Sequence, residues 1–181
     1  SFISYHRYPA KYLEDFNTDT DYFEYLRKYE PETLKGERVK SFEELLIADW
    51  LYLNGVYYEY EYPYEHKTSS MKKNQYRPDF FLGEGKYLEH FGINKEGKTA
   101  PQINSYNYNQ SIIWKRSLHR QKGTTLIETY SWERQEGIIL KNLEKKLNDI
   151  GIKIKPDDPA IIKELFERDD INKKLVSLVS D

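Results

Sequence analysis

Cysteine is absent from this chain of 181 residues. That absence excludes disulfides and metal sites built from thiolates, and it fits a reducing compartment, so we expect a cytoplasmic location. No apolar run approaches the roughly 20 residues of a membrane span, so we expect no membrane partner. Methionine occurs once, at Met71, and the chain begins with Ser1, which indicates an excised fragment or a processed product.

An excess of charge of one sign is also lacking, because the formal net charge is only −2. Any contact with nucleic acid must therefore come from a local basic patch. Tyrosine is abundant, with 17 residues. In "VYYEYEYPY" the alternation places Tyr58, Tyr60 and Tyr62 on one face of a strand and Glu59 and Glu61 on the other. We favour the core and surface of a sheet for these tyrosines over a base-stacking platform.

The apolar and turn patterns predict a helix first, then three strands, a helix, a strand and further helices. The predicted helices cover residues 9–29, 41–55, 111–122, 132–151, 160–167 and 171–179, and the predicted strands cover 57–62, 76–82, 86–93 and 124–131. Residues 65–75 and 94–110 read as loops. This order indicates a mixed α/β sandwich and not a series of βαβ units.

The stretch "YRPDFFLGEGKYLEHFGI" reads as two strands joined by a Gly-Glu-Gly turn. If Leu82 pairs with Lys86, the loop has three residues, which is a common hairpin length. That register places Asp79 directly opposite Glu89 on the same face of the sheet. A slip of one residue would separate the two acids.

Asp79, Glu89 and the more distant Glu44 are candidates for an acidic site. Two carboxylates on adjacent strands raise each other's pKa, and a fold tolerates them best with a cation between them. An oxygen-only ligand set suits Mg²⁺ or Mn²⁺, which can activate water to attack a phosphodiester. Pro78 belongs at an edge or a bulge, where a side chain is often redirected toward a site.

Each of these acids also has an ordinary interpretation. Glu44 stands three residues after Ser41, which is the S-x-x-E pattern of a capping box at a helix N-terminus. Asp79 and Glu89 could simply face solvent. Glu89 is harder to explain in this way, because Leu88, His90 and Phe91 surround it in the sequence.

The segment "WKRSLHRQK" is a candidate phosphate-binding surface. On a helix, Lys115 and His119 share one face, and Arg116 and Arg120 share another, with Lys122 close by. The stripe could hold a phosphate backbone, with Lys115 at the scissile phosphate. It could equally be a solvated basic face, and His119 by itself is more typical of a structural histidine.

The segment "GINKEGKT" matches the phosphate-loop pattern G-x-x-x-x-G-K-[ST] from Gly92 to Thr99. That motif requires a helix that starts at Gly-Lys-Thr, so that backbone N–H groups hold the phosphates. Pro101 and the following "QINSYNYNQ" favour a loop instead. The competing hypothesis is an independent nucleotide-binding protein that uses Lys98.

With Glu44, Pro78-Asp79, Glu89 and Lys115 in this order, the chain resembles the PD-(D/E)xK nuclease superfamily, which has the restriction-endonuclease-like fold. The closer resemblance is to the nuclease-like domain inserted in bacterial superfamily I DNA helicases of the UvrD/Rep type, including helicase IV-like proteins. The stretches that carry the resemblance lie within residues 39–131, about half of the chain.

The resemblance implies an α/β fold with a central mixed sheet flanked by helices and with extra N- and C-terminal helices. It divides the chain into an N-terminal helical segment and connector (1–35), a nuclease-like core (36–135) and C-terminal helices that pack on the core (136–181). Asp79 and Glu89 would hold Mg²⁺ or Mn²⁺, and Glu44 would be a further acid of the site.

The chain departs from the family pattern at one position, because Phe91 stands where a lysine is expected two residues after Glu89. Some members of the superfamily draw that lysine from a neighbouring helix, and Lys115 is then the natural candidate. DNA would be the substrate, contacted by Arg116, His119, Arg120 and Lys122, and the helicase motor domains of the parent chain would be partners. ATP would bind only to that motor. A non-catalytic domain that binds DNA or a partner protein is the alternative.

Overall fold

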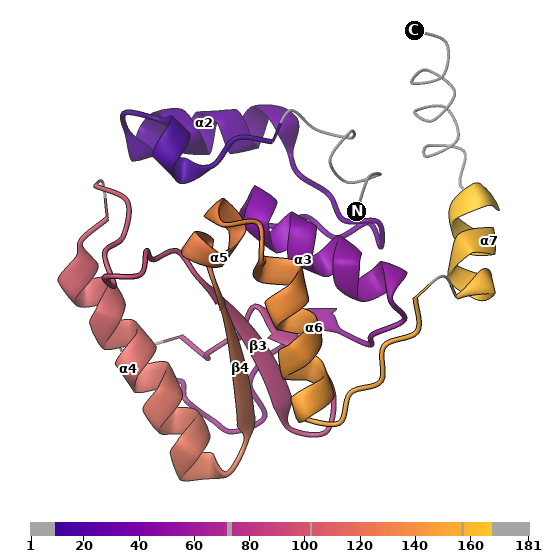
Figure 1. The fold of residues 1–181 in the computed structure, drawn as a ribbon. Coiled ribbons are helices and arrows are strands. Elements are labelled where there is room, and N and C mark those ends of the chain that lie inside the picture. The colour runs from indigo at the N-terminus through magenta and orange to yellow at the C-terminus, as the bar shows by residue number, and fades with distance from the viewer. Residues whose placement is uncertain (1–9, 72–73, 102, 157, 168–181) are drawn as a thin grey trace, which may run out of the picture.

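The computed structural model describes residues 10–71, 74–101, 103–156 and 158–167. It has a mixed α/β fold built on a four-stranded sheet with the strand order β1-β2-β3-β4 (Figure 1). The first three strands are antiparallel, and β4 runs parallel to β3. The strands are β1 (Glu59–Tyr60), β2 (Phe80–Phe81), β3 (Lys86–Phe91) and β4 (Thr125–Tyr130).

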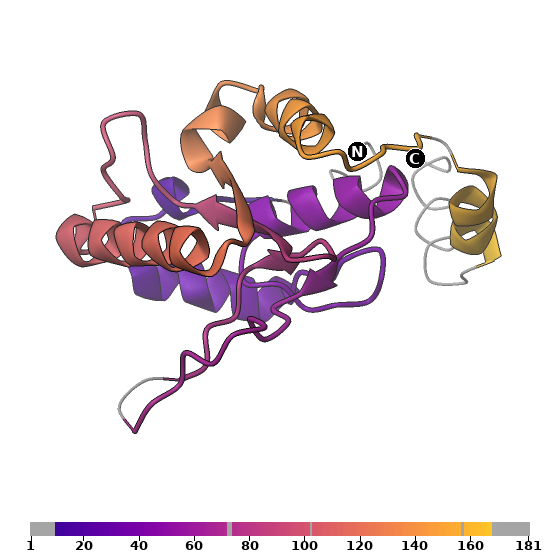
Figure 2. The same ribbon diagram turned by 90° about the horizontal axis from the view of Figure 1, so that it is seen from below.

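Helices cover both faces of this sheet and extend beyond it. They are the short 3₁₀ helix η1 (Leu13–Asp15) and the α-helices α2 (Asp19–Tyr29), α3 (Phe42–Leu53), α4 (Ser105–Lys122), α5 (Ser131–Gln135), α6 (Ile139–Asp149) and α7 (Pro159–Glu167). Figures 1 and 2 show α4 on one side of the sheet and α3 with α6 on the other. None of the helices in the described part of the chain has the length and apolar character that crossing a bilayer requires.

The alternation along β3 divides its side chains between the two helical layers. Leu88 packs against α3 and α6 in a core that includes the fully buried Leu143 and Leu147 of α6. Tyr87 points the other way and packs with Trp114 of α4. Because successive side chains of a strand alternate, Glu89 lies on the α4 face and His90 on the α3 face.

The hairpin between β2 and β3 has the predicted register. Phe80 pairs with Leu88, and the Leu82 N–H donates to the Lys86 carbonyl at 2.9 Å, which closes a loop of three residues. The same register carries Asp79, just before β2, to a position opposite Glu89. The predicted register and loop are therefore confirmed, but the strand predicted over residues 76–82 is limited to Phe80 and Phe81, and the strand predicted over 86–93 ends at Phe91.

Helix α3 begins as predicted, with Ser41 as its N-cap. The Ser41 hydroxyl accepts from the Glu44 N–H at 3.0 Å and donates to a Glu44 side-chain oxygen at 3.1 Å. Seven of the twelve helical residues are buried, so α3 is a central element of the core. The cap orients Glu44 at the end of the helix that approaches the sheet.

The predicted strand over residues 57–62 is wrong in its extent. Only Glu59 and Tyr60 pair with β2, because Glu61 adopts a left-handed backbone with a φ of 48°. The turn at Glu61 breaks the alternation. Tyr62, whose exposed fraction is 45%, stacks on Phe81 at a centroid distance of 5.3 Å.

Three helix predictions also need correction. The predicted loop over residues 94–110 ends early, because Asn104 caps α4 by accepting from the Asn107 N–H and the helix begins at Ser105. The single helix predicted over residues 132–151 is two helices, interrupted at Gly137 with a φ of 71°. The helix predicted over 9–29 is η1 and α2 with irregular chain between them. The helix predicted over 171–179 lies outside the described residues.

Candidate active site

Asp79 and Glu89 face the α4 layer from neighbouring positions of the hairpin. The Asp79 Oδ2 accepts a hydrogen bond from the backbone N–H of His90 at 2.7 Å. This bond connects the Asp79 side chain to β3 at a point just before the first residue pair of β2 and β3. Pro78 precedes Asp79 and offers no N–H to a ladder, which fits the late start of β2. Glu89 is almost wholly buried, with an exposed fraction of 1%.

Glu89 is held by two side chains. The Lys115 Nζ lies 2.5 Å from its Oε2, and the Tyr76 hydroxyl donates to its Oε1 at 2.6 Å. Helix α4 therefore brings Lys115 to the acids, as the sequence suggested. The amino group of Lys115 also lies over the rings of Phe91 and Tyr76, at 5.4 and 5.7 Å from their centroids. Phe91, at the position where a lysine was expected, thus supports the lysine that comes from α4.

Tyr76 is a site residue that the sequence analysis missed. Its hydroxyl also lies 3.2 Å from the His119 Nε2, and the His119 Nδ1 lies 2.8 Å from the Thr124 hydroxyl. These contacts form a buried chain from Thr124 to Glu89 that orients the carboxylate. Its members come from three separate stretches of sequence, around Tyr76, Glu89 and His119 with Thr124, which explains why no local pattern revealed it.

His119 lies in the interior of the molecule, with an exposed fraction of 2%. Burial, and secondly the charge of Lys115, lower the pKa of His119 to about 4. A side chain in this position does not reach a phosphodiester backbone. In this structure His119 belongs to the chain that holds Glu89, and not to the predicted phosphate-binding stripe.

Glu44 both caps a helix and belongs to the acidic group. Beside its bond with Ser41, it accepts a hydrogen bond from the Tyr60 hydroxyl. Burial raises the pKa of Glu44, and the charge of Asp79 raises it further. The two interpretations of Glu44 that the sequence left open are therefore compatible.

The acidic group carries more negative charge than its surroundings balance. Burial raises the pKa of Glu89, and Asp79 adds to that effect although Lys115 and Tyr76 oppose it. Within the described residues, Lys115 is the one basic side chain that forms an ion pair with Glu44, Asp79 or Glu89. A divalent cation between Asp79 and Glu89 would supply the missing positive charge.

The ligand set suits a cation held by few protein groups. Among the residues that the structure describes, no three histidine, aspartate or glutamate side chains gather closely enough to form a complete metal cage. Mg²⁺ rarely needs one, because it keeps several waters and is commonly bound by one or two carboxylates and by substrate phosphates. Asp79 and Glu89 provide such a pair, and both are oxygen ligands.

The remaining basic residues of the predicted stripe lie on the outside of α4. Arg116 forms two hydrogen bonds with the Glu128 carboxylate, at 2.7 and 2.6 Å, and a third with the Tyr130 hydroxyl. Arg120 and Lys122 are exposed, and neither pairs with an acid in the described ranges. These two are free to meet a phosphate backbone, whereas Arg116 already has a partner.

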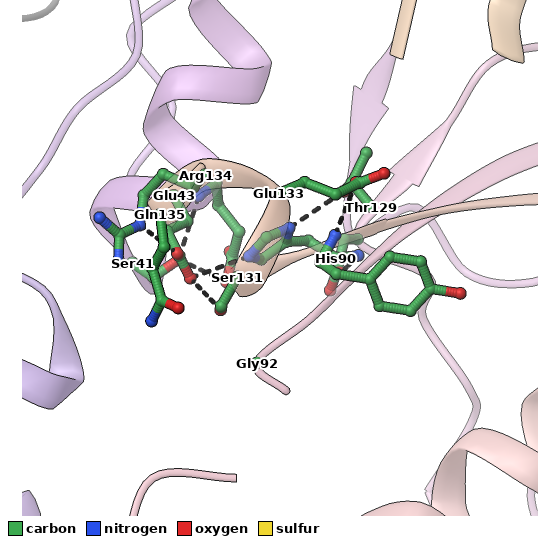
Figure 3. A network of polar contacts seen from close by, with 12 residues as sticks. Ser41, Glu43, His90, Gly92, Thr129, Ser131, Glu133, Arg134 and Gln135 are labelled. Atoms are coloured by element: carbon green, nitrogen blue, oxygen red, sulfur yellow. Dashed lines mark hydrogen bonds and ion pairs between the residues drawn. The ribbon is translucent and has the colours of Figure 1, made fainter. Parts of the chain in front are cut away.

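A second polar network lies on the opposite face of β3 and was also missed. The Glu43 carboxylate receives hydrogen bonds from Ser131 at 2.7 Å and from Arg134 at 2.6 Å, and its Oε2 lies 2.9 Å from the His90 Nε2 (Figure 3). The other ring nitrogen of His90 lies 3.0 Å from the Thr129 hydroxyl. This network closes the sheet against α3 and α5.

The segment Gly92 to Thr99 is a turn and not a phosphate loop. The Asn94 side chain accepts from the Lys98 N–H at 2.8 Å, and the Asn94 carbonyl accepts from the Gly97 N–H at 3.0 Å. Helix α4 begins only at Ser105, so no helix starts at Gly-Lys-Thr. The expectation of a loop at this motif is confirmed.

Comparison of the chain with protein-family models, with curated proteins and with solved structures gives no match. The assignment of a function therefore depends on the geometry of Asp79, Glu89, Lys115 and Glu44.

Proposed function

We propose that this chain is a metal-dependent nuclease domain that hydrolyses DNA phosphodiester bonds. The observation that carries the proposal is the position of Asp79 opposite Glu89, with the Lys115 Nζ 2.5 Å from Glu89. Two carboxylates and a lysine at one point suit a reaction in which a phosphate gains negative charge. Arg120 and Lys122 lie on the same helix as Lys115, where they can contact the DNA backbone.

In this proposal Asp79 and Glu89 hold Mg²⁺ or Mn²⁺. Such an ion, when bound, supplies an activated water and neutralises charge on the phosphate. Lys115 donates from its ammonium group to the phosphate oxygens as their charge grows. Tyr76 and Phe91 keep that ammonium group and the Glu89 carboxylate in place, and Glu44 extends the negative wall that faces the cation.

The proposal includes the restriction-endonuclease-like fold and a helicase parent. It is supported by the mixed sheet, by the acids on its hairpin and by a helix, α4, that leads to the parallel strand β4. The ATPase motor would lie outside this chain. A turn at Gly92 to Thr99 gives no phosphate-binding helix, so we expect the chain alone neither to hydrolyse ATP nor to unwind DNA.

The first experiment is an incubation of the purified chain with supercoiled and single-stranded DNA in Mn²⁺, Mg²⁺ or EDTA. We expect nicking that requires the metal, that Asp79→Ala abolishes and that Lys115→Ala lowers by roughly 10²-fold. Glu144→Ala and Lys141→Ala are matched controls, because both side chains are exposed on α6. Cleavage that persists in Asp79→Ala would overturn the proposal.

A non-catalytic DNA- or partner-binding domain is the second candidate. It is favoured by the fact that both Glu89 oxygens already have protein partners and that the pKa of Glu89 is raised, since a protonated carboxyl binds metal weakly. Calorimetric titration with Mn²⁺ separates the two candidates. Metal binding lost in Asp79→Ala supports the nuclease. DNA binding that weakens with salt, without any metal binding, supports the second candidate.

A further inference from the structure

A cavity of about 440 Å³ lies beside the acidic group. It is lined by the start of α3, the end of β3, residues between 92 and 101 together with Ile103, α5 and the N-terminal segment that includes η1 and part of α2. Its volume is in the range of small-molecule sites. Nothing in the proposed chemistry of Asp79 and Glu89 explains why this space exists.

Gly92 lies at the cavity wall, and its backbone conformation does not explain why a glycine is present. It is the one glycine of the nine that lacks a positive φ, so the backbone does not require glycine there. A Cβ at Gly92 would meet the Tyr108 hydroxyl at 3.7 Å and the Ser131 Oγ at 3.9 Å, both of them cavity residues. Figure 3 shows Gly92 just beyond Ser131 and His90. The missing side chain leaves the cavity open.

The walls combine aromatic rings with polar groups and lysines. Tyr22 is a buried wall residue, Phe23 has an exposed fraction of 51%, and Lys98 forms no ion pair with any described residue. The carboxylate of Glu43 in the wall is already balanced by Arg134. The other acids of the wall are Glu14, which also pairs with Arg134, and Glu44, and the Lys40 amine pairs with Glu61. Aromatic faces suit a nucleobase, and Lys98 suits a phosphate beside it.

Two residues connect the cavity with the acidic group, although Asp79, Glu89 and Lys115 do not line it. Glu44 lines it and interacts electrostatically with Asp79. Tyr108 lines it as well, and its hydroxyl accepts from the Gly92 N–H at 2.9 Å, one strand residue beyond Phe91. A phosphate held at Asp79 and Glu89 would thus have Glu44 and Tyr108 between it and the cavity, and its neighbouring nucleoside could reach the cavity past these two residues.

A strand of DNA fits the cavity better than a free nucleoside triphosphate. The N–H groups of Gly97 and Lys98 are used inside the turn by Asn94, so they cannot hold a triphosphate. A nucleotide that belongs to a strand needs no such anchor, because the acidic group would hold its phosphate. The cavity favours an unpaired nucleotide, since a base must leave its stack to enter a pocket of this kind.

We propose that this cavity takes the nucleoside next to the scissile phosphate from an unpaired strand, so that the substrates are single-stranded DNA and unpaired ends. The inference rests on the proposed nuclease function, and it names the substrate class of that site. It also gives a role to the segment from Gly92 to Thr99, which resembles a phosphate loop but does not form one.

The test is fluorescence anisotropy in EDTA with two labelled DNA ligands. One is an oligothymidine of about 10 nucleotides, a length suited to one binding groove, and the other is a blunt duplex. We expect Gly92→Leu, which adds a bulky side chain beside Tyr108 and Ser131 in the cavity wall, to weaken binding of the oligothymidine roughly tenfold, the scale of one lost base–aromatic stack. Phe23→Ala, at an exposed position, should weaken it severalfold. Asn148→Leu adds the same side chain to the exposed side of α6 and should change nothing.

The outcomes separate this inference from the nuclease itself. Unchanged oligothymidine binding by a folded Gly92→Leu, a wild-type preference for the duplex, or displacement of the oligothymidine by ATP would each overturn the inference. The cleavage assay with Asp79→Ala reports on the nuclease independently. Loss of binding in Gly92→Leu without any cleavage by the wild type supports the cavity and rejects the nuclease. Absence of oligothymidine binding by the wild type overturns the inference and leaves the nuclease to be judged by the cleavage assay.

Discussion

Two adjacent residues of β3 begin two different polar networks. His90 points toward α3, where Glu43 is surrounded by Arg134, Ser131 and His90 itself. Glu89 points toward α4, where it pairs with Lys115 and is affected by the charge of Asp79. Asp79 and Glu44 interact electrostatically with Lys40 and His90 but form no ion pair with a described residue. The first network is balanced in charge and the second is not. A fold gains nothing from unbalanced buried acids, so the second network marks the functional side of the sheet.

The pKa shifts follow the same division. Burial lowers the pKa of His90, but its hydrogen bond to Glu43 and the charges of Glu43, Asp79 and Glu44 outweigh burial, and the pKa is raised. The protonated histidine is thus stabilised by its network. Burial and Asp79 raise the pKa of Glu89, so its charged form is destabilised. The network on the α3 side stabilises the charged forms of its buried groups. On the α4 side the carboxylates of Glu89 and Asp79 repel each other, and a bound cation would reduce that repulsion.

Neighbouring glutamates on α3 give the largest test of this comparison. We expect Glu43→Gln to lower the free energy of unfolding by about 3 kcal/mol, because it removes the buried carboxylate that Arg134, Ser131 and His90 contact and leaves Arg134 with Glu14 as its acidic partner. Glu44→Gln should leave stability unchanged or raise it, because glutamine keeps the capping box with Ser41 and removes the repulsion with Asp79. Urea unfolding of both variants measures the difference. Equal losses in the two variants would refute the division into balanced and unbalanced networks.

The acid dependence of stability tests how the α4 side keeps Glu89 in place. A histidine of ordinary pKa in the unfolded chain binds a proton near pH 6.5, whereas the pKa of folded His119 is about 4. The unfolded state therefore binds more protons between these values. Stability should fall as the pH drops through that window, by at most about 3 kcal/mol from this group.

His119→Gln isolates that contribution. The variant loses a constant amount of stability at every pH, but the part of the acid dependence that belongs to His119 disappears. Glu44 and Glu89 have raised pKa values and act in the opposite direction, and both remain in the two proteins being compared. Urea unfolding from pH 4 to 7 gives the two curves, and parallel curves would show that His119 does not titrate as the structure requires.

The sequence predicts the hairpin and its acids well because their geometry is local. A three-residue loop sets the register, and the register sets Asp79 opposite Glu89. The start of α3 is equally local, since Ser41 and Glu44 form its capping box. Lys115 was selected for its residue type on a helix, and its contact with Glu89 depends on how α4 packs.

The remaining site residues could not be found in this way. Tyr76 and His119 meet across 43 residues of sequence, and Glu43 meets Arg134 across 91. Only the packing of the layers brings such pairs together. The short β1 has another cause, because the alternation of tyrosine and glutamate gave no sign that Glu61 would take a left-handed backbone. The polar start of α4 similarly depends on one cap, Asn104.

Removing one acid from the functional side should make the protein more stable. We expect Asp79→Asn to raise the free energy of unfolding by about 1 kcal/mol, because it relieves repulsion with Glu44 and Glu89 while its amide oxygen still accepts from the His90 N–H. Mg²⁺ should raise the melting temperature of the wild type but not of this variant, since a ligand stabilises only the state that binds it. A destabilised variant would show that Asp79 serves the fold.

The smallest expected effect concerns two basic residues of α4. Arg116 forms an ion pair with an acid, whereas Lys122 forms none with a described residue. Arg116 is already bound to Glu128 at the surface, so Arg116→Ala should cost less than about 1 kcal/mol of stability. It should also leave the salt dependence of DNA binding nearly unchanged. Lys122→Ala removes an unpaired cation and should lower the slope of log Kd against log salt by about 1, as expected for one phosphate contact. Anisotropy titrations over a range of salt concentrations measure both slopes. A larger change in Arg116→Ala than in Lys122→Ala would mean that DNA displaces Glu128, and that a paired arginine can still be part of the binding surface.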